Sequence, residues 1–220
     1  MLLELAGAPQ AARRDTQRRR SVEALAARFA GANRHGRQVA RLALTLFDGV
    51  GEALALPAVA RELVEYAALL HDIGHAIDHD RHQHHSCYLV RNAELVGFDR
   101  LEVEIVAQAV RGHRKQMPKL GDPELRALAG TVRHTVRGLA AILRLADALD
   151  RTHFGVVRGV EVAVTAHRVT IDVDAGENPE LELWAAERRV DLLSRILDRH
   201  IVLRCRRAAA RPIRLRAGAP

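Results

Sequence analysis

The sequence is poor in cysteine and in aromatic residues, and it contains no long uninterrupted apolar run. Its two cysteines, Cys87 and Cys205, lie far apart and form none of the short spacings of a metal-binding cysteine site. No stretch reaches the ~18 consecutive apolar residues that a membrane-spanning helix needs. The first residues also lack the basic start and the length of a signal peptide. We therefore expect a soluble protein of the reducing cytoplasm, with no membrane partner.

Aromatic residues make up only 3% of the chain, which is too few for a platform on which nucleic-acid bases stack. The net charge of +7 is also unevenly distributed. Residues 1–20 carry +3 and residues 204–220 carry +6, so the 183 residues between them carry −2. The basic character belongs to the two ends, and we expect no specific nucleic-acid binding by the rest of the chain.

Hydrophobic residues (48%) and charged residues (28%) are in the range of a globular protein with a core. Helical apolar spacing dominates up to residue 155, and alternating apolar residues then indicate strands. We predict a mainly α fold: a basic helical lead over 1–20, a helical domain over 21–155 with Ser21 as its first N-cap, and a small α+β module over 156–203. That module holds an antiparallel hairpin or three strands plus one helix over 180–197. A basic, disordered tail follows over 204–220.

The stretch Leu69–His75 stands out chemically. An apolar helical run ends by placing His71 on the inward face, and Asp72 follows directly, with Gly74 as the expected helix stop. A buried carboxylate without a partner is costly, and a divalent metal would satisfy both side chains at once. For an isolated pair, a core histidine capped by its neighbouring acid is the better interpretation. Other parts of the chain change that balance.

Three further positions place a histidine or an aspartate on an apolar helix face. His35 begins a stripe with helical spacing, His113 continues the face of the helix that starts near residue 99, and Asp147 lies against another stripe. Asp150 is a second candidate, with pairing to the adjacent Arg151 as the alternative. Each residue alone is weak evidence, but helices that converge on one core are a common source of metal ligands.

A histidine-rich tract supplies the last candidate ligand. It contains His79, His82, His84 and His85. A helix with Leu89 and Val90 in its core follows His85, so we select His85 as the ligand and leave the roles of the other three open. The alternative for the tract is a solvated loop.

Four segments together carry a resemblance to a known family. They are LHDIGH at 70–75, HSCYLVRNAEL at 85–95, GHRK at 112–115 and ILRLADALDR at 142–151. The order of these histidines and aspartates resembles the HD superfamily of metal-dependent phosphohydrolases. More specifically, the chain from about Ser21 to about Leu203 is similar to the C-terminal HD domain of the exopolyphosphatase/guanosine-pentaphosphatase (Ppx/GppA) family.

The resemblance implies an HD-type helical bundle with one or two transition ions such as Mn, Fe, Co or Ni. The implied first-ion ligands are His35, His71, Asp72 and Asp147, and the implied second-ion positions are His85 and His113. Asp72 and His75 would be catalytic, His75 standing where many members have a phosphate-contacting lysine. Arg114 and Lys115 would bind the phosphates of a phosphoanhydride or phosphoester, in the polyphosphate or nucleotide class.

A second interpretation is a non-catalytic module that binds polyphosphate or nucleotide and partners a separate exopolyphosphatase-type protein. In larger family members an actin-like fold precedes this region and carries the exopolyphosphatase site, and residues 2–5 resemble its last connector. A purely structural helical domain is the third interpretation. The sequence leaves open the substrate, the number of ions and whether the chain forms a homodimer.

Overall fold

The computed structural model describes residues 7–30, 33–114 and 123–207. The helical part contains α1 (Gly7–Ala30), α2 (Arg34–Val50), α3 (Ala60–Leu70), the 3-10 helix η1 (Ile73–Ala76), α4 (His82–Arg91), α5 (Arg100–Gly112), α6 (Pro123–Arg126) and α7 (Gly130–Ala148). The module that follows contains β1 (Val157–Val164), β2 (Arg168–Ala175), α8 (Glu180–Glu187), α9 (Val190–Leu197) and β3 (His200–Arg207). The fold is therefore mainly α with a small α+β module, as predicted. Within the described residues, no helix has the length and apolar character needed to cross a membrane.

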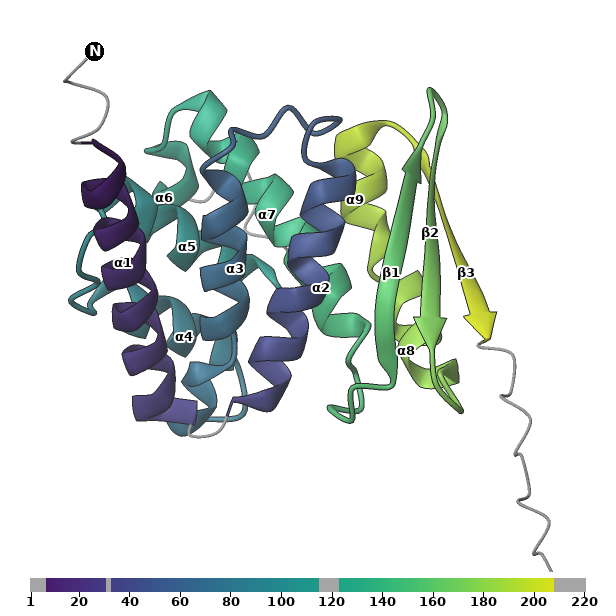
Figure 1. Cartoon of the computed structure of the whole chain (residues 1–220), viewed down its shortest axis with the longest axis horizontal. Helices are drawn as coiled ribbons and strands as arrows, with labels where there is room; N and C mark the ends of the chain where they lie inside the picture. The colour runs from purple at the N-terminus through teal and green to yellow at the C-terminus, as the bar shows by residue number, and fades with distance from the viewer. Residues whose placement is uncertain (1–6, 31–32, 115–122, 208–220) are drawn as a thin grey trace, which may run out of the picture.

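The bundle forms around α7, which is buried on nearly every side. Leu139, Ile142, Leu143 and Leu145 of this helix are all fully buried, as expected of a helix at the centre of a core. Burying each such leucine or isoleucine contributes roughly 1.5–3 kcal/mol. Helices α2 and α5 pack against α7, and α3 packs between them (Figure 1). These four helices share one core, and the start of α2 lies near the ends of α3, α5 and α7.

Helix α1 departs from the prediction. It runs without interruption through Ser21, whose hydroxyl donates to the carbonyl of Arg18 at 2.9 Å inside the helix instead of capping a new one. The boundary expected at residue 20 therefore falls within α1. Arg18 anchors this part of α1 to the bundle, because it is 2% exposed and forms ion pairs with Glu62 of α3 at 3.0 Å and Glu102 of α5 at 2.7 Å.

The sheet has the order β1-β2-β3. β1 and β2 form the predicted antiparallel hairpin, in which Val162 pairs with Ile171, and β3 adds a third strand parallel to β2. Parallel neighbours need a crossover connection, which α8 and α9 supply. The single helix expected over 180–197 is thus two helices. β3 also extends to Arg207, beyond the expected start of the tail at 204, and residues 208–220 lie outside the described part of the chain.

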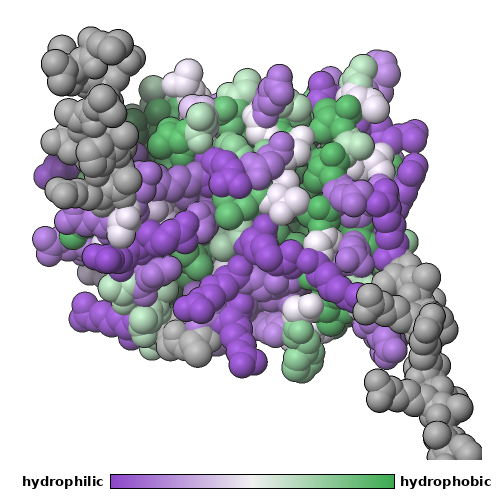
Figure 2. All heavy atoms as spheres, in the orientation of Figure 1, coloured by the Kyte–Doolittle hydropathy of each residue, from purple (hydrophilic) through white to green (hydrophobic). Residues whose placement is uncertain are grey.

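The module packs directly on the bundle rather than standing apart from it. Val157, Val160 and Ile171 belong to the same buried cluster as the core of the bundle. At the contact between α2 and β1, Gly49 leaves room for Val162, because a Cβ at position 49 would lie 2.4 Å from the Cβ of Val162. Figure 2 shows mainly hydrophilic side chains on the face that carries α1, α2 and α3, with hydrophobic ones visible between them.

Candidate metal centre

The candidate ligands meet because several helices begin or end at the same place. His35 is the second residue of α2, His71 and His113 are the C-caps of α3 and α5, and Asp147 lies in the last turn of α7. Asn33 fixes the start of α2 here: its carboxamide oxygen accepts from the Gly36 amide at 2.8 Å, and its nitrogen donates to the Leu69 carbonyl at 2.7 Å. This second bond ties the start of α2 to the end of α3.

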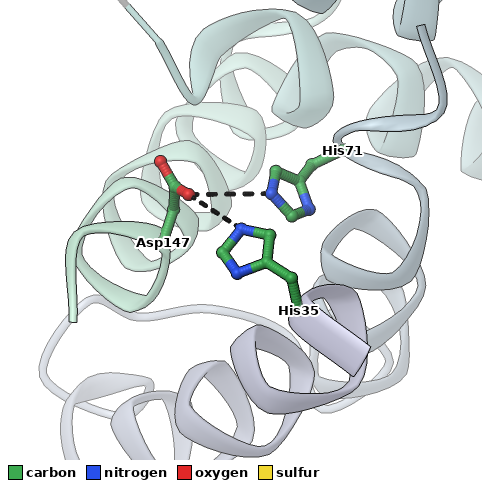
Figure 3. Close-up of side chains that lie close together, drawn as sticks. All are labelled: His35, His71 and Asp147. Carbon is green, nitrogen blue, oxygen red and sulfur yellow. Dashed lines mark hydrogen bonds and ion pairs between the residues drawn. The ribbon is translucent and has the colours of Figure 1, made fainter. Parts of the chain in front are cut away.

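Two carboxylates face the same two imidazoles. Oδ1 of Asp147 lies 3.3 Å from Nε2 of His35 and 3.7 Å from Nε2 of His71 (Figure 3). Oδ2 of Asp72 lies 3.7 Å and 3.4 Å from the same two nitrogens. The structure thus brings together the four side chains that the resemblance assigned to one ion.

Hydrogen bonds on the far side of each ring set which nitrogen faces the site. Nδ1 of His71 donates to the Ala68 carbonyl at 2.7 Å, and Nδ1 of His113 donates to the Val110 carbonyl at 2.6 Å. Both C-cap histidines therefore keep a proton on Nδ1, which leaves Nε2 free as a ligand atom.

Asp150 fixes His35 in the same way. Its Oδ2 lies 2.8 Å from Nδ1 of His35, and its Oδ1 accepts from the Gly155 amide at 2.9 Å. The sequence left two possibilities for Asp150, namely a ligand or a partner of Arg151. The structure instead places it behind His35, where it orients the imidazole.

A second group of side chains faces the other oxygen of Asp72. Oδ1 of Asp72 lies 3.2 Å from Nε2 of His82, 3.6 Å from Nε2 of His75 and 3.7 Å from Nε2 of His113. Arg114 borders this group, with its Nη1 3.0 Å from Nδ1 of His82. The two oxygens of Asp72 therefore point to two different sets of imidazoles.

Within the histidine-rich tract, the structure brings His82 rather than His85 to the candidate centre. His82 is 1% exposed and contacts both Asp72 and His113, whereas His85 belongs to none of the groups of convergent ligand atoms among the described residues. The inward stripe of α4 runs through positions 82, 86 and 90, with Ser86 and Val90 fully buried. Leu89 and Val90 are both expected in the core of this helix, but Leu89 is only partly buried. Steps of four residues back from Val90 reach Ser86 and then His82.

Gly74 allows η1 and α4 to approach closely. A Cβ at this position would lie 2.2 Å from the His82 carbonyl oxygen and 2.5 Å from the Ser86 backbone nitrogen. The Gly74 amide donates to the Ser86 hydroxyl at 2.8 Å. The expected role of Gly74 as a helix stop is therefore wrong: α3 ends at Leu70, and Gly74 instead fixes the distance between Asp72 and His82.

The carboxylates are held in the ionised form. Burial raises the pKa of Asp72, but His71, His75 and His82 outweigh it and hold that pKa well below the usual range. Burial likewise opposes ionisation of Asp147, and the nearby imidazoles of His35 and His71 again lower its pKa below the usual range. Metal ligation requires this ionised state.

The imidazoles differ among themselves. Burial lowers the pKa of His35, but Asp147 and Asp150 raise it to about 9 overall. Burial also acts against the charge on His71, and the neighbouring carboxylates outweigh it and raise its pKa. Burial and the charge of His71 lower the pKa of His113 to about 4. The carboxylates thus favour the charged form of His35, whereas His113 favours the neutral form.

The residues fit a divalent cation. Nε2 of His71 is buried and has no hydrogen-bond partner among the described residues, although it faces two carboxylates. Imidazole nitrogen and carboxylate oxygen are ordinary ligands of transition ions, and the ligand atoms of each group lie within 4.8 Å of one another.

Sequence reasoning also missed His153. This residue follows α7, has φ +61°, and stacks on His35 with ring centroids 3.6 Å apart and an interplanar angle of 9°. With His35 and Asp72 it forms a further group of close ligand atoms. Its only sequence signal is its distance of six residues from Asp147. Lys115, the other expected phosphate ligand, lies outside the described residues.

Comparison with known proteins gives a consistent match. A model of the family described as Ppx/GppA phosphatase, domain III, matches residues 17–188. Guanosine-5'-triphosphate,3'-diphosphate pyrophosphatases of Vibrio vulnificus and Vibrio cholerae are each 32% identical over 189 residues, which is 82% of this chain and 37% of each relative. A protein of the same description from Pseudoalteromonas translucida is 29% identical over 103 residues, 46% of this chain and 21% of that relative. The chain thus spans about a third of the length of the two Vibrio relatives.

Proposed function

Since the chain belongs to the Ppx/GppA phosphatase domain III family, we propose that it is an HD-type, metal-dependent phosphohydrolase domain. Its substrate would be a phosphoanhydride or phosphoester of the polyphosphate or nucleotide class. The Vibrio relatives, whose printed description is a guanosine nucleotide pyrophosphatase, support this class of reaction. The chemistry itself would come from the candidate metal centre.

The observation that carries the proposal is the position of Asp72 between two sets of imidazoles. His35, His71, Asp72 and Asp147 would hold one ion. Asp72, His82 and His113 would hold a second, with His75 at its edge. Mn, Fe, Co or Ni suit such a donor set better than Mg, because imidazole is a poor magnesium ligand. When bound, the ions would polarise a phosphoryl oxygen and lower the pKa of a coordinated water.

The remaining side chains have separable tasks. Asp72 and Asp147 are ionised, so they can orient a water molecule and accept hydrogen bonds from it. Arg114 borders His82 and can neutralise negative charge on a phosphate bound beside the centre. His75 has 32% of its side chain exposed and lies at the edge of the same group, where a phosphate oxygen could reach it. Lys115 remains a predicted second phosphate contact.

Metal analysis followed by a phosphate-release assay tests the proposal. The purified chain should carry about one or two transition ions, and it should release phosphate from at least one of polyphosphate, nucleoside tri- and tetraphosphates or simple phosphoesters. Asp72→Ala should lose most of the metal and all turnover while remaining folded. The matched control is Asp48→Ala, because Asp48 is exposed and pairs with Arg61 at the surface. Less than about a tenth of an ion per chain after reconstitution with Mn or Fe would refute the metal centre.

Arg114→Ala provides a more specific test. The loss of one charge-assisted contact costs roughly 1.5–3 kcal/mol, or about ten- to a hundredfold in rate if the contact acts mainly in the transition state. Metal content should not change. An unchanged rate would remove Arg114 from the proposed phosphate site without affecting the metal ligands.

The second candidate is a non-catalytic polyphosphate- or nucleotide-binding module that partners an exopolyphosphatase-type protein. It is retained because the match covers only 37% of the Vibrio relatives. It predicts no phosphate release from any of these compounds, together with polyphosphate binding that weakens as salt increases. A full set of ligand atoms at the centre favours the enzyme, since a binding module has no need to keep them.

A further inference from the structure

We infer that the turn over residues 152–155 is a recognition element, in which Phe154 stacks on the planar ring of a nucleotide whose phosphates occupy the metal centre. This inference rests on the proposed function. The observation behind it is the juxtaposition of a rigidly held turn, an exposed aromatic side chain and a ring that touches the centre. The turn joins α7 to β1 at the end of the bundle where α2 begins (Figure 1).

The backbone of the turn is fixed on both sides. Glu182 of α8, which is fully buried, accepts hydrogen bonds from the Thr152 amide at 3.1 Å and the Thr152 hydroxyl at 2.5 Å. On the other side, the Gly155 amide donates to the side chain of Asp150 and the His153 amide donates to its carbonyl at 3.0 Å. The module thus holds the turn against the metal centre through Glu182.

Within this turn, His153 and Phe154 point to different surroundings. His153 adopts a left-handed backbone conformation that is uncommon for residues other than glycine, and its ring stacks on His35. Phe154 is 86% exposed, the highest value for a large hydrophobic side chain in the described part of the chain. Consecutive Cα atoms are about 3.8 Å apart, so the Cα of Phe154 lies that far from the Cα of His153, whose ring contacts His35 at the centre.

A single exposed apolar residue is ordinary on a protein surface. This one differs because the residues on both sides of it are held by hydrogen bonds, so that contact with a ligand ring would order little additional backbone. The expected ligand is a nucleotide rather than a simple phosphate, since a nucleobase offers a flat face next to a phosphate chain. Polyphosphate and small phosphoesters offer no such face and should not depend on Phe154.

Binding of two non-hydrolysable probes by the metal-loaded chain tests this inference. β,γ-imido GTP carries a base, and imidodiphosphate carries only the phosphates. By calorimetry, Phe154→Ala should bind β,γ-imido GTP about five- to a hundredfold more weakly and imidodiphosphate equally well, and Phe154→Trp should restore nucleotide affinity. Tyr88→Ala is the matched control, because Tyr88 is 64% exposed on α4. It should leave both affinities unchanged.

The outcomes separate this inference from the proposed function. Equal losses for both probes, no loss for the nucleotide, or a similar loss in Tyr88→Ala would overturn the role of Phe154 while the metal centre could still bind phosphates. Failure of the wild-type chain to bind imidodiphosphate would count against the proposed function itself, and the inference would fall with it.

Discussion

Helices α3 and α5 each carry a charged cluster at both ends, and the two clusters differ in kind. At the N-terminal ends, Glu62 and Glu102 pair with Arg18, and we call this group the arginine cluster. At the C-terminal ends, His71 and His113 meet Asp72, and we call this group with its neighbours the histidine cluster. The rise of an α-helix places the clusters roughly 14 Å apart along α3 and roughly 16 Å apart along α5.

The difference lies in how each cluster is neutralised. In the arginine cluster, a cation of the chain meets anions of the chain, and Arg18 also lies 4.1 Å from the ring centroid of Phe98. In the histidine cluster, ligand atoms converge, and Nε2 of His71 finds no hydrogen-bond partner in the part of the chain that the structure describes. A group that is neutralised internally stabilises the fold. A group whose ligand atoms converge on one point would be neutralised by a bound cation, as proposed above.

The largest expected effect is on stability, at the arginine cluster. Arg18→Ala removes one member of a buried ion-pair network and should lower the free energy of unfolding by about 3 kcal/mol, because Glu62 and Glu102 lose their partner. Chemical denaturation would measure it. Arg14→Ala is the control: Arg14 has 59% of its side chain exposed and approaches Glu102 only to 3.8 Å, so its loss should cost under about 1 kcal/mol. Equal losses at both positions would contradict the comparison.

Metal should stabilise the histidine cluster independently. Ion at a hundredfold excess over its dissociation constant should add about 2.7 kcal/mol to the free energy of unfolding, since it binds the folded chain. Thermal unfolding with MnCl2 and with EDTA would show the increment. Because the two clusters are more than ~10 Å apart, a mildly destabilised variant such as Arg18→Lys should gain the same increment as wild type. A smaller gain would mean that the clusters are coupled.

Asp150 tests orientation within the histidine cluster. Asp150→Ala should weaken metal binding about ten- to a hundredfold, because the carboxylate that fixes the imidazole of His35 is lost while every ligand atom remains. Competition with a chromogenic chelator would measure the change. Asp48→Ala is again the control, and an unchanged affinity in Asp150→Ala would argue against this role.

The smallest expected effect concerns His85. His85→Ala should leave metal content unchanged, whereas His82→Ala should remove one ion where the wild type binds two. Elemental analysis of both variants, prepared side by side, decides between the two histidines. Loss of metal in His85→Ala alone would restore the assignment made from the sequence.

Sequence periodicity predicted the features that are set by residues close together in the chain. The stripes of α2 and α5, the start of α5 near residue 99 and the β1–β2 hairpin follow from neighbours within a few residues, and the structure confirms each of them. The positions of His35, His71 and Asp147 also followed, because each ends or begins a strong stripe. Arg18, by contrast, is buried through Glu62 and Glu102, which lie 44 and 84 positions away. Asp150 and His153 likewise belong to the site because they contact His35, which is distant from both in the sequence.

The parallel pairing of β3 with β2 has a consequence for synthesis of the chain. A chain emerging N-terminus first completes β2 at Ala175, but β3 begins only at His200. At roughly 5–20 residues per second, the edge of β2 waits about 1–5 s for its partner. During that interval it is an open template for pairing with other chains. Its charged residues Arg168, Asp172 and Asp174 oppose such pairing, so the strand carries its own protection against aggregation until the crossover helices have been made.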